Sequence, residues 1–262
     1  MASINNRHVE YNLAELLSCV ASRLLQDNQS VFVGTGLPMI AAMLAQRMHA
    51  PHILIIFEAG SIGPHVPVLP ISVGDSRTFY KAVAATSMHD VMAAAQAGYI
   101  DYGFVGAAAI DAYGNLNTTV IGDWDKPKVR LPGSGGANDL GSFCWRTLYI
   151  MRNQSQRTFV NKLDFITTPG WLDGPGARER AGLPANCGPY RVITQLGVYG
   201  FDEQTKRLTL LSLHPGVTVE DVQANSEFQI LVPDRVAVTE PPTGEEQRIL
   251  REIDPSGMVL GK

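Results

Sequence analysis

An open three-layer α/β/α sandwich with a mainly parallel sheet is the fold class that the sequence predicts. The apolar run at residues 53–57 is typical of a strand buried on both faces, as in parallel sheets. A shorter strand is expected at residues 30–33, and residues 38–48 between the two have the character of a helix. Because strand, helix and strand follow one another, we expect a right-handed crossover between parallel strands.

The other elements follow from apolar spacing and from capping residues. Apolar side chains from Leu13 to Leu24 recur every three or four positions, and Asn12 is placed to cap the resulting helix. A second helix is expected over residues 88–97, closed by Gly98. Capping boxes at Thr218 and Thr243 begin two further helices, and strands are expected at residues 102–105, 148–151, 165–167, 192–194, 197–201 and 208–213.

The composition limits the class of protein. The chain has 262 residues, 45% of them hydrophobic, which suffices for one large domain or two small ones. The formal net charge of −4 and the lack of a basic run argue against a nucleic-acid partner. No stretch reaches the roughly 18 consecutive apolar residues of a membrane span, and residues 1–10 lack the apolar core of a secretory signal.

The cysteines and histidines favour neither disulfides nor a metal site. Cys19, Cys144 and Cys187 are far apart and form no Cys-x-x-Cys pair, so we expect reduced thiols in a cytoplasmic protein. His, Asp and Glu nowhere cluster with the spacing of metal ligands. We therefore expect no bound metal.

Glu58 is the first candidate for chemistry. It follows the buried run directly, and ligands in open α/β sheets bind beyond the carboxyl ends of such strands. Ala59 and Gly60 leave room for a substrate to approach it. A solvated carboxylate at a strand end is the simpler interpretation, and a covalent nucleophile is the sharper one.

A glycine-rich loop is the second candidate. Residues 133–136 read Gly-Ser-Gly-Gly, and such a loop can present successive free N–H groups to an anion or an oxyanion. A flexible turn before an element that starts near Asn138 explains the same residues.

Arginines supply the third set of candidates. The loop at residues 169–180 holds a tryptophan and Arg178, which could meet a carboxylate or phosphate, although a surface crossing with paired arginines accounts for it as well. Arg77 and Arg130 are two further cations that could meet a carboxylate.

Taken together and in order, these segments resemble the β subunit of family I coenzyme A (CoA) transferases, the glutaconate-type enzymes most of all. The resemblance runs over nearly the whole chain. It is carried by residues 33–38, 57–60, 111–117, 121–123, 133–138, 169–180 and 253–255.

The resemblance implies a single α/β/α domain over residues 1–262, with Glu58 as the catalytic carboxylate. In such enzymes the carboxylate attacks an acyl-CoA, forms an anhydride, and then carries CoA as a glutamyl thioester until a second acid takes it. CoA is thus a substrate, and no permanently bound cofactor is implied. Gly135 and Gly136 become candidate oxyanion donors in a CoA-contacting loop that continues through Ala137 and Asn138.

The same resemblance implies a separate α subunit, which completes the site and assembles with β into a hetero-oligomer. It also makes Asn117 and Arg178 candidate substrate contacts for small mono- or dicarboxylic acids. Two alternatives stay open. The chain could belong to a CoA-ester hydrolase, ring-opening enzyme or decarboxylase on the same scaffold, or it could be a non-catalytic subunit that only completes its partner's site.

Overall fold

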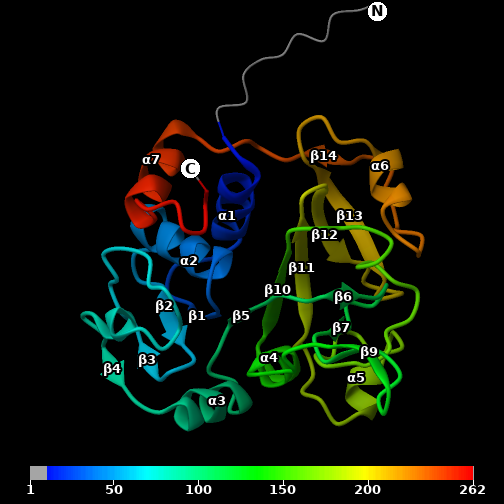
Figure 1. The fold of residues 1–262 in the computed structure, drawn as a ribbon, viewed down its shortest axis with the longest axis horizontal. Helices are drawn as coiled ribbons and strands as arrows, with labels where there is room; N and C mark the ends of the chain where they lie inside the picture. The colour runs from blue at the N-terminus through cyan, green and yellow to red at the C-terminus, as the bar shows by residue number, and fades with distance from the viewer. Residues whose placement is uncertain (1–10, 262) are drawn as a thin grey trace, which may run out of the picture.

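The computed structural model describes residues 11–261, in which helices are interspersed among strands along the chain (Figure 1). The helices are α1 (Leu13–Arg23), α2 (Leu37–Met48), α3 (Met88–Gln96), α4 (Ala137–Phe143), α5 (Ala177–Arg180), α6 (Val219–Ala224) and α7 (Gly244–Ile253), with a 3-10 turn η1 at Ser76–Phe79. The strands are β1 (Ser30–Val33), β2 (Leu54–Phe57), β3 (Ser61–Ile62), β4 (Ala84–Ala85), β5 (Tyr102–Val105), β6 (Ala109–Ile110), β7 (Leu116–Asn117), β8 (Val120–Gly122), β9 (Pro127–Arg130), β10 (Arg146–Met151), β11 (Pro189–Thr194), β12 (Gly197–Phe201), β13 (Leu208–Leu213) and β14 (Ala237–Val238).

One ten-stranded sheet organises the fold, in the order β14-β13-β12-β11-β10-β5-β1-β2-β3-β4. Its centre, from β11 to β2, is parallel throughout. Antiparallel strands extend it on both sides, through β12 and β13 at one end and β3 and β4 at the other. Because the central strands run the same way, their carboxyl ends lie along one edge, where open α/β sheets bind ligands.

Helices cover both faces of this sheet, which confirms the predicted sandwich of three layers. Helices α1, α2 and α7 pack together over one face, although α7 is remote from the others in sequence (Figure 1). Helices α3 and α4 pack on the opposite face. Each face of the sheet therefore has its own hydrophobic core, the first beneath α1, α2 and α7 and the second beneath α3 and α4. The side chains of β1 alternate between them, with Val31 and Val33 in the first core and Phe32 in the second.

The predicted helix starts at Asn12, Thr218 and Thr243 are confirmed as capping boxes. At α7, Thr243 Oγ1 accepts from the backbone N–H of Glu246 at 3.2 Å, and the Glu246 carboxylate accepts from the N–H of Thr243 at 2.7 Å. Glu246 also forms a 2.6 Å ion pair with Arg23 at the end of α1. This pair joins the two helices across the first core.

After α7, the chain turns around the buried carboxylate of Asp254. It accepts hydrogen bonds from the backbone N–H groups of Met258, Val259 and Leu260 at 2.8–3.0 Å. Burial alone would raise the pKa of Asp254, but these bonds outweigh it and hold the pKa below its usual value. These bonds fix the turn of the C-terminal segment, residues 254–261, which Asn12 and Arg152 hold against the body through the carbonyl oxygens of Leu260 and Val259.

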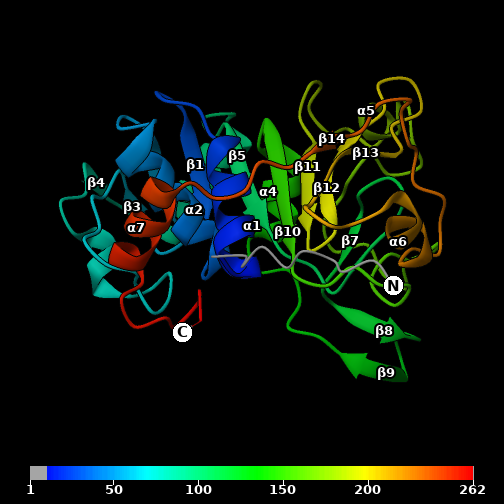
Figure 2. The ribbon, with the colours of Figure 1, turned by 90° about the horizontal axis from the view of Figure 1, so that it is seen from above.

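Most predicted strands coincide with observed ones, and one is wrong. Residues 165–167 form no strand, and Thr168 makes only an isolated bridge to Leu116. The β8–β9 hairpin was not predicted, and Figure 2 shows it projecting from the body of the molecule. Its second strand is largely exposed, so it lacks the apolar alternation on which strand prediction depends.

Cys19, Cys144 and Cys187 are free and buried. Burial raises the pKa of the Cys19 thiol to about 12 and also raises the pKa values of Cys144 and Cys187. Within residues 11–261, no helix combines the length and the apolar character needed to cross a bilayer.

Candidate active site

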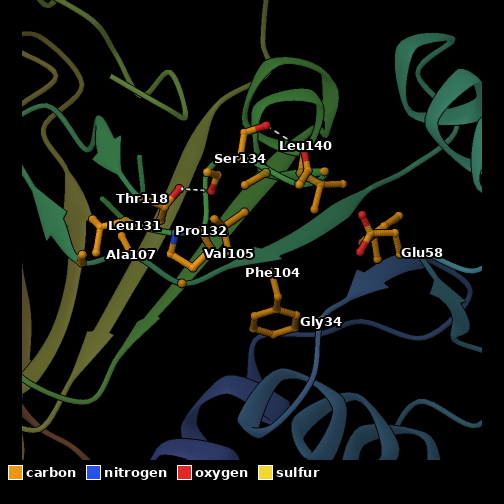
Figure 3. A pocket seen from close by; sticks show the side chains of 17 residues that line it. Gly34, Glu58, Phe104, Val105, Ala107, Thr118, Leu131, Pro132, Ser134 and Leu140 are labelled. Atoms are coloured by element: carbon orange, nitrogen blue, oxygen red, sulfur yellow. Dashed lines mark hydrogen bonds between the residues drawn. The ribbon is translucent and has the colours of Figure 1, made fainter. Parts of the chain in front are cut away.

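Glu58 lies at the carboxyl edge of the sheet, directly after β2, and is half-buried. It lines a cavity of about 380 Å³ at that edge. Figure 3 shows its side chain facing the cavity from one side, with Thr118, Leu131 and Pro132 opposite. The ion pairs formed within residues 11–261 involve other carboxylates, so that of Glu58 has no cationic partner there.

The glycine-rich loop forms the wall of the cavity next to Glu58. A Cβ atom added at Gly136 would lie 3.3 Å from Glu58 Oε1 and 2.5 Å from Met92 Cε. One added at Gly135 would lie 3.9 Å from the same oxygen. The fold thus brings together two segments that the sequence marks independently as candidates.

Glycine is favoured at each of these loop positions for a different physical reason. Gly133 and Gly135 have φ angles of +96° and +49°, a region that favours glycine. Gly136 has an ordinary φ of −77°, but a Cβ atom there would displace the end of the Met92 side chain and crowd the Glu58 carboxylate. The loop is therefore shaped for close approach to the carboxylate.

The backbone N–H groups of this loop are unequally available. The N–H of Gly133 donates to Thr118 O at 2.8 Å, and that of Ala137 donates to Ser134 O at 2.9 Å. Among the hydrogen bonds of the described residues, none uses the N–H of Gly135 or Gly136. Of the predicted loop residues, these two keep free donors next to Glu58, whereas the N–H of Ala137 is already occupied.

The two asparagines predicted at the site are engaged with nearby backbone groups. Asn138 Nδ2 donates to Thr167 O at 3.0 Å, which ties α4 to the neighbouring loop. Asn117 is 1% exposed; its Oδ1 accepts from Thr119 N at 2.9 Å, and its Nδ2 donates to Val120 O at 2.7 Å. These contacts fix the turn between β7 and β8, so we do not retain Asn117 as a substrate contact.

Arg178 lies outside the Glu58 cavity. Its side chain is 1% exposed and donates to the carbonyl oxygens of Gly141, Pro169, Gly170 and Ser142 at 2.8–3.2 Å. Burial lowers the pKa of its guanidinium. A buried cation surrounded by carbonyls holds loops together, so we do not retain Arg178 as a substrate contact either.

The other two predicted arginines also lie away from the cavity walls. Arg77 pairs with Asp75 beside η1, and Arg130 lies over the ring of Trp124 on the β8–β9 hairpin, 4.8 Å from its centroid. Neither lines a cavity that Glu58 lines.

Two further cavities adjoin the first, and no sequence motif predicts them. One, of about 460 Å³, shares Glu58, Gly135 and Gly136 with it and extends towards Met88, His89 and Met92 of α3. The other, of about 560 Å³, shares Gly34, Phe104 and Gly106 and is bounded by Arg152, Met258 and Val259. Glu58 thus lines two adjoining cavities, and the third cavity meets the first at the sheet edge.

No group of three or more His, Cys, Asp or Glu side chains among residues 11–261 is arranged to hold a metal ion. In the first cavity, the polar groups besides Glu58 are instead backbone groups and the hydroxyls of Thr118 and Ser134. Such groups suit the stabilisation of developing negative charge on oxygen.

Comparison with known proteins finds relatives over nearly the whole chain. The chain is 41% identical to the B subunit of 3-oxoadipate CoA-transferase from Pseudomonas knackmussii, over 93% of this chain and 94% of the relative. It is 38% identical to the B subunit of glutaconate CoA-transferase from Acidaminococcus fermentans, over 95% and 94% of the two chains. The crystal structure of that organism's glutaconate CoA-transferase superposes with a TM-score of 0.91 at 37% identity, covering 97% of this chain and 99% of the other.

The family model for coenzyme A transferase matches residues 15–225, which span Glu58, the glycine-rich loop and all the strands of the parallel centre. The high coverage in both directions with B subunits also places the chain on the β side of such enzymes. The chain therefore belongs to the coenzyme A transferase family, as a β-type subunit of family I.

Proposed function

We propose that this chain is the β subunit of an enzyme that moves CoA between small carboxylic or dicarboxylic acids through a thioester on Glu58. One observation carries the proposal. The Glu58 carboxylate has no cationic partner within residues 11–261, lines a cavity at the ligand-binding edge, and lies against two glycines with free N–H groups. Relatives named as B subunits of CoA-transferases support the reaction class.

The proposed reaction begins when a Glu58 carboxylate oxygen attacks the thioester carbonyl of an acyl-CoA. The tetrahedral intermediate carries an oxyanion, for which the N–H groups of Gly135 and Gly136 are the donors that we propose. Collapse breaks the carbon–sulfur bond and gives a mixed anhydride and CoA thiolate. The thiolate then attacks the glutamyl carbonyl, which yields glutamyl-CoA and releases the first acid as its carboxylate.

The second half of the reaction is the first half in reverse. An incoming carboxylate attacks the glutamyl-CoA thioester, and the thiolate leaves and recaptures the new acyl group from the anhydride. Glu58 is regenerated, and no net proton or electron is consumed. Binding energy from the remote parts of CoA can drive the difficult first attack by a weak nucleophile.

A separate α subunit completes the active enzyme in this proposal, because the relatives are named as B subunits of larger transferases. We expect it to close the open side of the Glu58 cavity and to exclude water, which would otherwise hydrolyse the anhydride. Free buried cysteines suit a reducing compartment, and we place the protein in the cytoplasm.

The test is to trap the intermediate in the αβ complex. The complex is incubated with acetyl-CoA, reduced with borohydride, digested and mapped by mass spectrometry. We expect the reduced glutamyl product at Glu58 and nowhere else, together with CoA exchange into added carboxylic acids. The Glu58→Gln variant, which keeps the shape of the side chain, should lose both signals. Exchange that survives in this variant would overturn the proposal.

The same experiment separates transfer from hydrolysis, ring opening or decarboxylation. Those reactions need no CoA-bearing glutamate and no acceptor acid. Free CoA released at full rate without an acceptor, with no adduct at Glu58, would favour a hydrolase. No contact within residues 11–261 favours that chemistry over transfer.

A further inference from the structure

The cavity that contains Glu58 continues into a second one along the carboxyl edge of the sheet. Gly34, Phe104 and Gly106, which follow or end the central strands β1 and β5, line both cavities. Because these residues line both, the two cavities meet at the sheet edge, and we call the two together the edge groove. It begins at Glu58 and ends at Arg152, beside the C-terminal segment.

Arg152 is the one lysine or arginine among the residues that line these two cavities. It follows β10 directly, and its Nη2 donates to Val259 O at 3.1 Å. The carboxylate of Asp254 in turn accepts a hydrogen bond from the backbone N–H of Val259 at 2.8 Å and so fixes Val259 in place. The guanidinium is thus held at the end of the groove, while the ion pairs within the described residues leave it without a carboxylate.

We propose that Arg152 binds the distal carboxylate of a diacid substrate whose other carboxyl group reacts at Glu58. This inference rests on the proposed transferase function and narrows its substrate class to dicarboxylic acids. A guanidinium presents paired N–H donors that match a carboxylate. The largely apolar lining of the cavity next to Glu58 suits the carbon chain of such an acid.

The strand register gives the span that a substrate must bridge. Glu58 lies level with Tyr149, three strands away, and Arg152 lies three residues further along the direction of β10. With strands about 4.8 Å apart and a rise of about 3.3 Å per residue, the two Cα atoms are about 17 Å apart. At about 1.5 Å per bond, the extended side chains of Glu58 and Arg152 together cover about half of this distance. A short diacid, with its contacts to the two side chains, is long enough to cover the rest.

The same span argues against a phosphate of CoA as the partner of Arg152. A coenzyme attached at Glu58 extends through its pantetheine arm, which is much longer than the remaining gap. Its phosphates would therefore lie well beyond the guanidinium unless the arm folded back. The distal carboxylate of a diacid is the anion that reaches Arg152 directly.

The test compares a diacid with its monoacid counterpart in the αβ complex. Glutarate and pentanoate serve as acceptors with acetyl-CoA as donor, and KM and kcat are measured for each. We expect wild type to prefer glutarate. Arg152→Gln should raise the KM for glutarate by about 10- to 100-fold, the usual cost of losing a hydrogen bond to a charged group. The KM for pentanoate should change far less, and Arg152→Lys should recover part of the loss.

Two controls make the result specific. Arg130→Gln also removes one positive charge, from the β8–β9 hairpin outside both cavities, and should leave the KM values of both acceptors unchanged. Acetyl-pantetheine as donor lacks the phosphates of CoA. An effect of Arg152→Gln on the KM of acetyl-CoA that disappears with acetyl-pantetheine would overturn the inference and assign Arg152 to a phosphate.

Equal effects on glutarate and pentanoate, or no preference in wild type, would also overturn the inference. Trapping CoA on Glu58 separates this failure from that of the proposed function. If CoA is trapped on Glu58 but diacids are not preferred, only the proposed role of Arg152 is rejected. If no CoA is trapped on Glu58, the proposed transferase function is rejected as well.

Discussion

Gly136 is the position where a single methyl group should test the geometry around Glu58. We predict that Gly136→Ala lowers kcat by about 10- to 100-fold, because small displacements of reacting groups cost this much. The added Cβ would meet Met92 Cε at 2.5 Å and Glu58 Oε1 at 3.3 Å, and the φ of −77° permits alanine. Steady-state exchange kinetics measure the loss. Gly244→Ala, with no atom within 4 Å of its Cβ, is the matched control.

Arg178 should matter for stability and not for substrate binding. We predict that Arg178→Lys lowers the free energy of unfolding by about 3 kcal/mol, since an ammonium cannot satisfy the same buried carbonyls. Urea unfolding of the variant and wild type gives the difference. A variant of normal stability with a raised KM for the acid would restore the substrate role expected from the sequence.

Glu58 and its glycine loop were predictable because their signals are local. A carboxylate that ends an apolar run, and glycines in a row, can be recognised without knowing the fold. Arg152 was not predicted, because it follows an ordinary strand and acquires meaning only when β10 lies beside β5. The contacts of Arg178 could not be predicted for the same reason, since its carbonyl partners come from segments outside its own loop and within it.

At the scale of elements, the C-terminal segment makes stability depend on acid pH. The folded pKa of Asp254 is lowered, so its contribution is present above the unfolded pKa of about 3.9 and is lost as pH falls through the folded value. We predict that wild type loses stability below about pH 4 and that Asp254→Asn loses less over the same range. The variant should already be less stable at pH 7.

Urea unfolding of both proteins at several pH values measures this effect. Glu246 also has a lowered pKa, because its bonds to Arg23 and Thr243 outweigh the effect of burial, and both proteins share that contribution. The difference between their pH profiles therefore isolates Asp254. Parallel profiles would show that its carboxylate adds nothing on folding.

Elements with strong periodicity or clear caps were predicted well, and short ones were not. Strands β5, β12 and β13 have the predicted bounds, because each has an apolar core between turn residues. Strands β6, β7 and β8 have only two or three residues, too short to show a period, and β9 is largely exposed and lacks apolar alternation. The predicted strand at 165–167 failed because Phe165 and Ile166 are exposed and have no partner strand.

At the scale of the whole molecule, the open cavity predicts that this chain needs its partner. We expect the isolated chain to bind acyl-CoA weakly and to catalyse no exchange, and the addition of the α subunit to restore activity up to an equimolar ratio. Size-exclusion chromatography and exchange assays on the same mixtures measure both. The Glu58→Gln chain should compete with wild type for α and reduce the rate. Full activity without α would contradict the prediction.

The sandwich was predictable from the order of strands and helices, because parallel crossovers leave few arrangements of the sheet. The antiparallel extensions at its two ends were not, since their pairing partners are set by contacts between distant segments. The single domain over residues 1–262 stays a prediction, and residues 1–10 and 262 lie outside the described part of the chain.

Burial of every cysteine has a consequence for a protein that handles activated acyl groups. A surface thiolate would capture such groups by S-acylation and poison the enzyme slowly. Here the thiols of Cys19, Cys144 and Cys187 are shielded and kept protonated. Ellman's reagent can therefore report CoA lost to hydrolysis continuously, because the buried thiols of this folded chain contribute no background colour.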